Sequence, residues 1–405
     1  MKRQVFIYTS IYPYSIMAES FLGEELQVAS HCECEVTVIP IGKDQIKREM
    51  PQGVSLDNSL CERSFLKNCR AILGIFKPRF LKELLYNPAR PFKLKFIKDT
   101  VKYLFAANLV YNHLRKVADK NQNSIFYSYW TSYIPIAFAD YKRKHKGTSH
   151  QFICRSHTFA SFGTTVVDLY YPMRDYVFQW IDKFYVISSV LYSKLQEVYP
   201  QYSEKFILSR LGVKDNASSK KNISNNIELL SCSSIIPLKR VDLIFDSIKE
   251  YVCLHPESHF RWSHIGDGPL MEPLRKKIDE CQIKNLTVDL MGAMPNEQIL
   301  KIYRERKFHA LILLSIREGL PVVLMEAISS GIPVIATRVG GIPDIVTDRT
   351  GRMVERDFTK EEFCDALKWV LDNNDSLSIS CHEFFQSSFN AENNYNSFYS
   401  SILSL

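Results

Sequence analysis

The segment from 315 to 346 has the residue types and spacing best suited to bind an anionic ligand. An apolar run ends at Ser315, Glu318 follows in a short loop, and Pro321 is well placed as the first residue of a helix. Backbone N–H groups at the start of a helix bind anions, and Gly319 admits close approach. We therefore expect an anionic group at this strand end, held at the helix start within the segment 319–322.

Glu326 follows in PVVLMEAI, a predicted helix that is otherwise apolar on all sides. A carboxylate in such surroundings is costly unless it accepts hydrogen bonds. The two neighbouring hydroxyls of a ribose suit a group that only accepts. Glu326 therefore either binds a ribose or serves the structure, bonded to the backbone or to a neighbouring basic residue.

In the first half of the chain, His157 follows a predicted strand over 151–155. Ligands collect at the carboxyl ends of strands in open α/β sheets. Arg155 lies two residues earlier on the same side of the strand, so we expect it to point into the same cleft. His157 either contacts a ligand there or is a loop histidine satisfied by the backbone.

Alternating strand and helix patterns position these residues. Each half begins with a strand, a polar loop and a helix: strand 4–9 precedes a helix from 18, and strand 228–231 precedes a helix from 241. Apolar strands such as ALILLS and PVIAT are typical of a parallel sheet that is covered on both faces. The sequence therefore predicts the α/β class, with two doubly wound units.

Two further segments bear on the domain organisation. The stretch 214–225 is polar, Ser/Asn-rich and without apolar periodicity, which predicts a linker. The tail 385–405 carries aromatic and apolar residues at helical spacing, so a terminal helix must dock on another surface.

Composition excludes several classes of protein. The chain has 405 residues, 51 Lys+Arg against 44 Asp+Glu, and 46% apolar residues, which is ordinary for a globular protein with two domains. No apolar run reaches the roughly 18 to 20 residues that cross a bilayer. The start lacks a cleavage site for secretion, and the ten cysteines are scattered. We therefore expect a cytoplasmic protein without a disulfide framework or a metal site.

The segment from Cys61 to Lys120 is strongly basic, with 14 Lys+Arg and 4 Asp+Glu. Its stretch PFKLKFIKDTVKYLF predicts a helix that carries basic and aromatic residues. This helix presents either an ordinary solvated face or a contact with anionic lipid headgroups or a phosphate-bearing acceptor. No nucleic-acid-binding motif accompanies the charge, so we expect no nucleic-acid partner.

The sequence resembles glycosyltransferase family 4, the retaining GT-B transferases, and more narrowly the enzymes of bacterial capsule, exopolysaccharide and colanic-acid synthesis. Glu318 and Glu326 match the pattern E-x7-E, and GIPVIATRVGGIPDIV is close to the usual continuation. SSIIPLKRVDLIFDSI resembles the segment that grips the donor diphosphate, with Lys239 as the retained cation. HIGDGPL and MGAMPNEQI resemble two strand ends beside the nucleotide, and FYSYW, ICRSHTF and FILSRLGV resemble first-half segments of the capsule enzymes.

This resemblance implies a GT-B fold, with two Rossmann-like domains that face each other across a cleft. The implied domains are an acceptor-binding domain over 1–213, the linker 214–225 and a nucleotide-sugar-binding domain over 226–382. A C-terminal helix over 383–405 is expected to cross back onto the first domain.

The implied activity is retaining transfer of a sugar from a nucleotide-diphosphate sugar to a hydroxyl of a glycan or an undecaprenyl-diphosphate-linked acceptor. The setting would be capsule, exopolysaccharide or O-antigen synthesis at the inner face of the plasma membrane, with peripheral contact to anionic lipid. The residues implied as catalytic are His157, Glu318 and Lys239. Those implied in substrate binding are Arg155, Ser15, Arg240, Gly319, Leu320, Pro321, Val322, Glu326, Gly266, Gly292 and Met294. No Asp-x-Asp occurs in the chain, so we expect no obligatory metal and no cofactor besides the donor.

The chain departs from the family pattern in two places. Ser234 stands where many relatives have Arg, so one phosphate contact is missing or comes from Arg240 or Arg210. The first loop, 10–17, lacks the glycines that many relatives have there. A non-catalytic GT-B sugar-binding protein and a nucleotide-sugar epimerase on the same fold stay open as alternatives. A nicotinamide oxidoreductase is not supported, because the Gly-rich fingerprint lacks its third glycine.

Overall fold

The computed structural model describes residues 2–15, 19, 21–45, 47–61, 94–157, 173–218, 222 and 224–405. The chain forms two compact units. Unit 1 comprises Met1–Arg210 and Tyr395–Leu405, and unit 2 comprises Leu211–Asn394. Part of the basic segment predicted from Cys61 onward lies outside the described residues.

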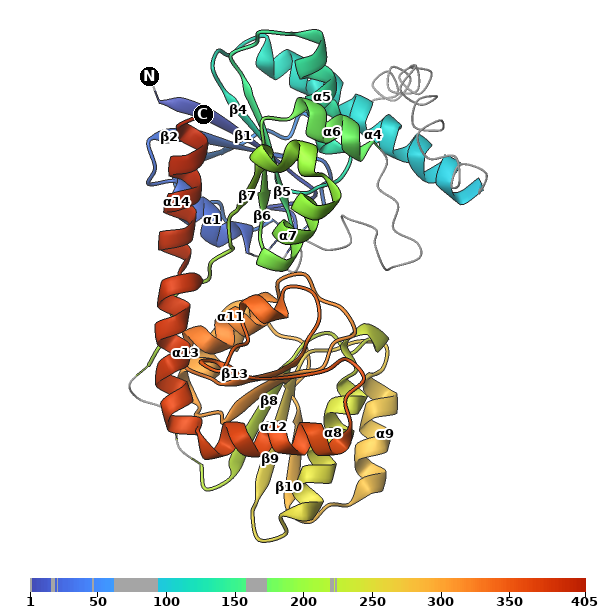
Figure 1. Cartoon of the computed structure of the whole chain (residues 1–405), viewed down its shortest axis with the longest axis vertical. Coiled ribbons are helices and arrows are strands. Elements are labelled where there is room, and N and C mark those ends of the chain that lie inside the picture. The colour runs from blue at the N-terminus through green and yellow to red at the C-terminus, as the bar shows by residue number, and fades with distance from the viewer. Residues whose placement is uncertain are drawn as a thin grey trace. The chain divides into compact units, whose positions relative to one another are not determined.

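Unit 1 is built on a seven-stranded parallel sheet in the order β3-β2-β1-β4-β5-β6-β7 (Figure 1). The strands are β1 (Arg3–Thr9), β2 (Cys34–Pro40), β3 (Val54–Leu56), β4 (Ile125–Ser128), β5 (Gln151–Ser156), β6 (Lys183–Val186) and β7 (Phe206–Leu208). Its helices are α1 (Leu22–Ala29), α4 (Leu94–Ala118), α5 (Ile134–Lys144), α6 (Arg174–Trp180) and α7 (Ser189–Val198), followed by the 3-10 turn η3 (Pro200–Lys205).

Both faces of this sheet are covered, because alternate residues of a strand point to opposite sides. On β1, Val5 and Ile7 pack in a cluster with residues of α1. Phe6 and Tyr8 lie in a second cluster with residues of α4 and α5. The near-continuous apolar strands therefore bury both of their faces, as a parallel sheet requires.

The terminal helix α14 (Ala391–Leu403) ends in unit 1, where Phe398, Tyr399 and Ile402 are buried in the same cluster as Val5. Figure 1 shows α14 in red beside α1. The predicted docking of the tail is therefore confirmed.

Unit 2 contains a six-stranded parallel sheet in the order β10-β9-β8-β11-β12-β13. The strands are β8 (Ile227–Cys232), β9 (Phe260–Ile265), β10 (Leu286–Leu290), β11 (Ala310–Leu313), β12 (Val334–Thr337) and β13 (Gly351–Val354). Its helices are α8 (Val241–Leu254), α9 (Met271–Cys281), α10 (Asn296–Glu305), α11 (Val322–Ser329), α12 (Lys360–Asp372) and α13 (Asn374–Ser388), with 3-10 turns η4 (Pro237–Lys239) and η5 (Ile342–Asp344). Strands β8 to β10 extend the sheet toward one edge, and β11 to β13 extend it toward the other. Ligands bind in such sheets where this order reverses, which here is between β8 and β11.

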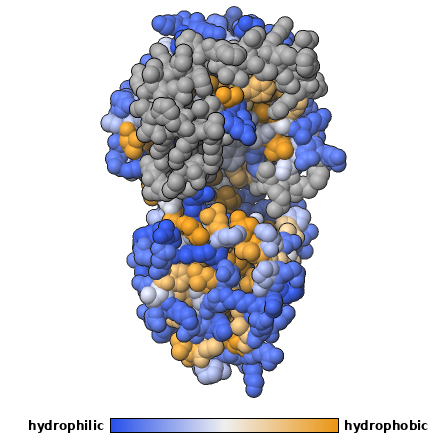
Figure 2. Space-filling view, turned by 90° about the vertical axis from the view of Figure 1, so that its right-hand side faces the viewer, coloured by the Kyte–Doolittle hydropathy of each residue, from blue (hydrophilic) through white to orange (hydrophobic). Residues whose placement is uncertain are grey.

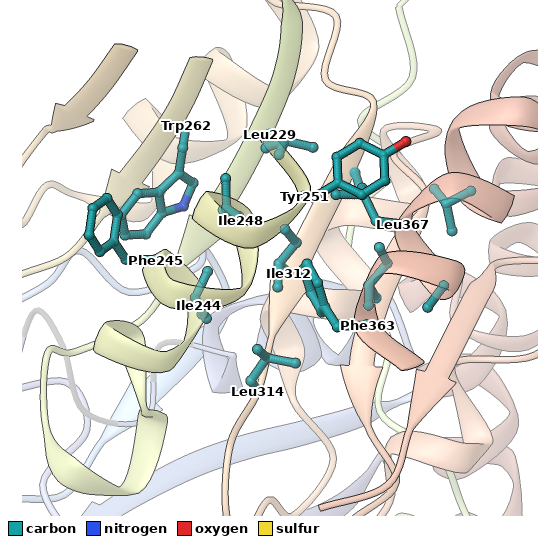
Figure 3. Packing of buried hydrophobic residues seen from close by; sticks show 14 of the residues in the cluster. Leu229, Ile244, Phe245, Ile248, Tyr251, Trp262, Ile312, Leu314, Phe363 and Leu367 are labelled. Carbon is teal, nitrogen blue, oxygen red and sulfur yellow. The ribbon is translucent and has the colours of Figure 1, made fainter. Parts of the chain in front are cut away.

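The core of unit 2 lies between its sheet and its helices. Figure 3 shows Ile244 and Ile248 of α8 close to Leu229 and Ile312 of the strands, and Phe363 of α12 beside them. Figure 2 shows that apolar residues, in orange, also reach the visible face of the lower part, among hydrophilic residues in blue. Scattered exposed apolar residues of this kind are ordinary on a protein surface.

The α/β class with two doubly wound units is confirmed, with differences at particular elements. The helix predicted from 18 begins at Leu22, because Glu19 has φ +56°, outside the right-handed helical region. The sequence analysis missed the short strands β3 and β13, and it missed the two long helices α12 and α13. Across the described ranges, no helix is both long and apolar enough to span a membrane.

Candidate functional site

Lys239 and Glu318 meet at the carboxyl ends of two neighbouring strands of unit 2. Lys239 closes the turn η4 after β8, and Glu318 lies in the loop after β11. The Lys239 Nζ lies 2.5 Å from the Glu318 Oε1, and their side chains are 21% and 10% exposed. The structure thus brings together two residues that the sequence predicts for one site. The ammonium can bind a phosphate, and the carboxylate can accept hydrogen bonds from hydroxyls.

The loop after β11 is held mainly by contacts between backbone atoms. The Gly341 N–H donates to the Gly319 carbonyl at 2.7 Å. Gly340 has φ +57°, and a Cβ at this position would lie 1.9 Å from the Glu318 carbonyl oxygen. Only glycine fits there, so the loops after β11 and β12 pack with their backbones in contact.

Helix α11 starts one residue later than predicted, at Val322. Pro321 is its N-cap with extended backbone, and Leu320 is buried before it. The predicted anion-binding segment therefore lies at a helix start beside Glu318. This placement is compatible with the predicted anionic ligand, which stays a prediction.

Glu326 is 8% exposed on α11, and its Oε1 accepts a hydrogen bond of 2.8 Å from Asn296 Nδ2. The partner is thus an amide side chain on α10, in addition to the backbone or basic partners considered from the sequence. Asn296 was not predicted, because it lies 30 positions earlier in the chain and only the fold brings it close. The hydrogen bond between Asn296 and Glu326 does not test whether Glu326 binds a ribose, so that assignment stays a prediction.

The two predicted glycine-bearing strand ends lie side by side. The Gly266 N–H donates to the Gly292 carbonyl at 2.9 Å, which ties the ends of β9 and β10. Gly266 has φ +147°, and a Cβ there would lie 1.9 Å from the Ser233 carbonyl oxygen. Met294, half-buried, follows two residues after Gly292. Gly266 thus permits the close backbone packing of the strand ends after β8 and β9, and its hydrogen bond to Gly292 adds the end of β10.

His264, a residue outside the predicted set, fixes the segment after β8. Its Nδ1 lies 2.7 Å from Ser231 Oγ, and its Nε2 donates to the Ser233 carbonyl at 3.1 Å. The Trp262 Nε1–H donates to the same hydroxyl oxygen at 2.9 Å. Burial lowers the pKa of His264 to about 4, so the ring is neutral at neutral pH. This neutral network holds the backbone immediately before Ser234.

Arg240 was predicted to contact phosphate, and the structure gives it partners within the protein. Its Nε donates to the Leu314 carbonyl at 2.6 Å, and its Nη1 donates to the Arg356 carbonyl at 2.8 Å. Burial lowers the pKa of Arg240. Two of its three nitrogens thus bind carbonyls just after β11 and β13. In this structure Arg240 therefore connects these two strand ends, and its contact with phosphate stays a prediction.

In unit 1, His157 is 5% exposed and lies against the rings of Tyr129 and Trp130, with ring centroids 4.6 and 4.7 Å away. Neither ring nitrogen makes a well-aligned hydrogen bond with the residues that the structure describes. Burial, together with the charge of Arg155, lowers the pKa of His157 well below its ordinary value. The Tyr129 backbone opposes this shift through a hydrogen bond. The ring is thus neutral at neutral pH, and its contact with a ligand stays a prediction.

The predicted orientation of Arg155 does not fit the structure. Arg155 is fully buried, its Nη1 lies 2.5 Å from Glu25 Oε2, and its guanidinium covers the ring of Phe398 on α14 at 3.9 Å. Strand β5 ends at Ser156, so the alternation of sides does not extend to His157. Arg155 therefore lies beneath α14 and is removed from the proposed substrate contacts.

The first loop follows β1 and contains the predicted residue Ser15, which is half-buried. Its conformation depends on a residue that the sequence analysis missed. The amides of Ser10, Ile11 and Tyr12 all donate to the carboxylate of Glu19, at 2.9, 2.9 and 2.6 Å. A buried carboxylate thus holds the loop that lacks the family's glycines.

Within the described part of the chain, no group of three or more His, Cys, Asp or Glu side chains could hold a metal ion. The expectation of a site without an obligatory metal or cofactor stays a prediction.

Comparison with known proteins finds a match within unit 2. Residues 213–384 match the family model described as Glycosyl transferases group 1. WcaL of Escherichia coli K12, named as a glycosyltransferase of colanic acid biosynthesis, is 27% identical over 200 residues, 47% of this chain and 48% of that protein. The amylovoran biosynthesis glycosyltransferase AmsK of Erwinia amylovora is 26% identical over 151 residues, 36% of each chain. The chain thus spans about half or less of the length of these relatives.

Solved structures with the same fold cover the whole chain. The lipopolysaccharide outer core galactosyltransferase WaaB has a TM-score of 0.65 at 15% identity, over 99% of each chain. Anabaena HepE, solved in complex with UDP, has a TM-score of 0.65 at 13% identity, over 100% of each chain. At these identities the likeness shows the fold alone, which is the predicted arrangement of two Rossmann-like units.

Proposed function

We propose that this chain is a retaining glycosyltransferase of family 4 type. It moves a sugar from a nucleotide-diphosphate sugar to a hydroxyl of a glycan or lipid-linked oligosaccharide, in the synthesis of a cell-surface polysaccharide. The match of residues 213–384 to the model of Glycosyl transferases group 1 and the polysaccharide relatives WcaL and AmsK support this proposal. HepE, of the same fold, was solved with UDP, which supports a nucleotide donor.

One observation carries the proposal: Lys239 and Glu318 form an ion pair at the reversal point of the unit 2 sheet. A donor would exchange this pair for its own groups, with its diphosphate on the ammonium and its sugar hydroxyls on the carboxylate. Glu326 on α11 and its hydrogen-bond partner Asn296 on α10 would bind the ribose hydroxyls. The anionic diphosphate suits the ammonium of Lys239, and the hydroxyls of the sugar and ribose donate hydrogen bonds that the carboxylates accept.

In the proposed reaction, the bond between the anomeric carbon and the diphosphate oxygen breaks. The acceptor oxygen bonds to the same carbon on the same face, and its proton passes to the departing diphosphate. Lys239 and the start of α11 stabilise the negative charge that develops on the diphosphate, without an obligatory metal. Glu318 and Glu326 place the donor, and neutral His157 of unit 1 contacts the reacting sugar or hydroxyl.

A thermal-shift screen against uridine, guanosine and adenosine diphosphate sugars tests the donor site. A nucleotide sugar at 100 times its Kd is expected to stabilise the protein by about 2.7 kcal/mol. Replacing Glu326 by Ala removes the ribose acceptor and is expected to abolish this shift. Glu280→Ala, at an exposed position of α9, is the matched control and should keep it.

Three results would contradict parts of the proposal. A shift that persists undiminished in Glu326→Ala contradicts the ribose assignment. Nucleotide binding without turnover on any glycan acceptor favours the non-catalytic binding protein. Conversion of the donor in the absence of an acceptor favours the epimerase.

We also propose that unit 1 contacts an anionic membrane that carries the acceptor. The C-terminal ends of α4 and α5 pack together, with Lys144 Nζ donating to Tyr111 Oη at 3.2 Å. Exposed cations gather at these two ends: Arg115, Lys116, Lys120, Arg143, Lys144 and Lys146. Basic residues near an anionic bilayer contribute about 1 kcal/mol each to its attraction.

Co-sedimentation with phosphatidylglycerol vesicles tests this surface. Replacing Arg115, Lys116 and Arg143 by Gln is expected to weaken vesicle binding about 100-fold, because roughly 3 kcal/mol of attraction is lost. The control replaces Lys276 and Lys301, exposed cations of unit 2, by Gln. Equal binding to neutral phosphatidylcholine vesicles, or no loss in the triple variant, would rule out an electrostatic membrane contact at this surface.

A further inference from the structure

Glu19 is a buried carboxylate with no role in the proposed reaction. It is 4% exposed and has φ +56°, a backbone conformation that is uncommon for a residue with a side chain. Three successive amides, those of Ser10, Ile11 and Tyr12, point at its two carboxylate oxygens. Successive N–H groups that converge in this way form an anion-binding concavity. Here the anion is a side chain of the protein itself.

Glu19 also reaches a second strand end of the same unit. The indole N–H of Trp130, in the loop after β4, donates to the same oxygen that the Ser10 amide contacts. The Trp130 ring in turn lies against His157, with ring centroids 4.7 Å apart. Strands β1, β4 and β5 are neighbours in the sheet, so one carboxylate joins the loops after β1 and β4, and the Trp130 ring extends this contact to the end of β5.

His157 depends on such packing contacts for its orientation. Among the described residues, its ring nitrogens make no well-aligned hydrogen bond, and the one polar contact is with the Tyr129 backbone, which raises the pKa against the effect of burial. Of the rings that the structure describes, those beside it belong to Phe21, Tyr129 and Trp130. Among these three, Trp130 is the one whose polar atom is fixed by a charged group, through Glu19.

We propose that Glu19 is a positioning residue, whose carboxylate holds Trp130 and through it the ring of His157. This inference rests on the proposed function, because it assigns Glu19 to the geometry of that reaction. It carries a second consequence for the donor. The amides of Ser10, Ile11 and Tyr12 are occupied by Glu19, so the first loop does not offer them to the diphosphate, whose binding is left to unit 2.

The test compares Glu19→Gln with the wild-type chain in three measurements. The Gln side chain has a single acceptor oxygen and cannot accept from all four N–H donors. Trp130 is then held less firmly, and kcat is expected to fall about 30-fold. The Kd of the nucleotide, measured by calorimetry, should stay within twofold. The ring proton resonances of His157, assigned with a His157→Asn variant, should move because the ring currents of Trp130 change. Glu35→Gln, at an exposed position on β2, is the control and should change none of these.

Trp130→Phe is the second variant, since it keeps an aromatic ring beside His157 and removes only the indole N–H. It should lower kcat in the same direction with an unchanged nucleotide Kd, and it decides the test if Glu19→Gln does not fold. An unchanged kcat together with unmoved His157 resonances would overturn the inference. Tenfold weaker nucleotide binding in Glu19→Gln would overturn the inference that the first loop takes no part in binding the diphosphate. If the wild-type chain transfers no sugar, the proposed function fails, and the His157 resonances alone decide whether Glu19 positions the ring.

Discussion

Replacing Lys239 by Met is expected to lower kcat/KM for sugar transfer about 1,000-fold, with the chain still folded. Lys239 is the fixed cation at the proposed diphosphate site, and the loss of one such group from a site of developing charge costs about 10²- to 10³-fold in rate. The pair with Glu318 lies at a sheet edge and is partly exposed, so its loss leaves no fully buried charge. Steady-state kinetics with the donor found in the thermal-shift screen measure the effect, and circular dichroism checks the fold.

Lys277→Met is the matched control for this prediction. Lys277 also lies 2.5 Å from a carboxylate, that of Asp246, but the pair joins α8 and α9 on the surface of the same unit. Its loss should change kcat/KM less than twofold. A Lys239→Met variant with wild-type kinetics would contradict the proposed diphosphate site, and a comparable loss in Lys277→Met would point to general destabilisation.

Replacing Arg155 by Met is expected to destabilise unit 1 by about 3–5 kcal/mol, because the Glu25 carboxylate then remains buried without its counter-charge. Both side chains have no exposed area in the ion pair. Burial already raises the pKa of the Glu25 carboxyl while Arg155 opposes that shift, so the variant should raise this pKa further. A protonated Glu25 is less costly to bury, so the destabilisation should shrink as the pH falls.

Urea unfolding at pH 7.5 and pH 5.5 measures this effect, and hydrogen exchange of α14 reports whether the terminal helix loosens. The double variant Arg155→Met with Glu25→Leu should recover most of the loss, since both charges are removed together. Lys194→Met, which breaks an exposed pair with Glu197, should stay within about 0.5 kcal/mol. A loss in Arg155→Met as small as in this control would show that the buried pair contributes little to the docking of α14.

Much of the fold follows from local sequence patterns. Apolar runs bounded by polar loops predicted strands such as those over 4–9, 151–155 and 228–231, because a parallel sheet that is buried on both faces is built from such runs. Strand β3 has three residues with a Ser in the middle, and β13 contains Gly351 and an Arg, so neither has an apolar run to detect. Helix α12 begins at a Thr359 and Glu362 capping box, a signal that was present in the sequence and missed.

The candidate site shows what local patterns leave out. Lys239 and Glu318 were predicted for one site, and the neighbouring positions of β8 and β11 bring them together. Asn296 and Glu19 were missed because their partners are set by tertiary contacts, between α10 and α11 for Asn296 and with the loops after β1 and β4 for Glu19. Arg155 was placed on the correct strand but wrongly oriented, since the sequence does not show where the strand ends or what the tail covers.

The glycine contacts at the strand ends of unit 2 bear on how such a site can diversify. Gly340 against the Glu318 carbonyl, and Gly266 against the Ser233 carbonyl, join backbone to backbone. These two contacts involve backbone atoms alone, so they do not depend on the side chains of Glu318 and Ser233. A substitution at a half-buried loop position such as Met294 would leave both contacts intact, so side chains of these loops can vary while the backbone framework is kept.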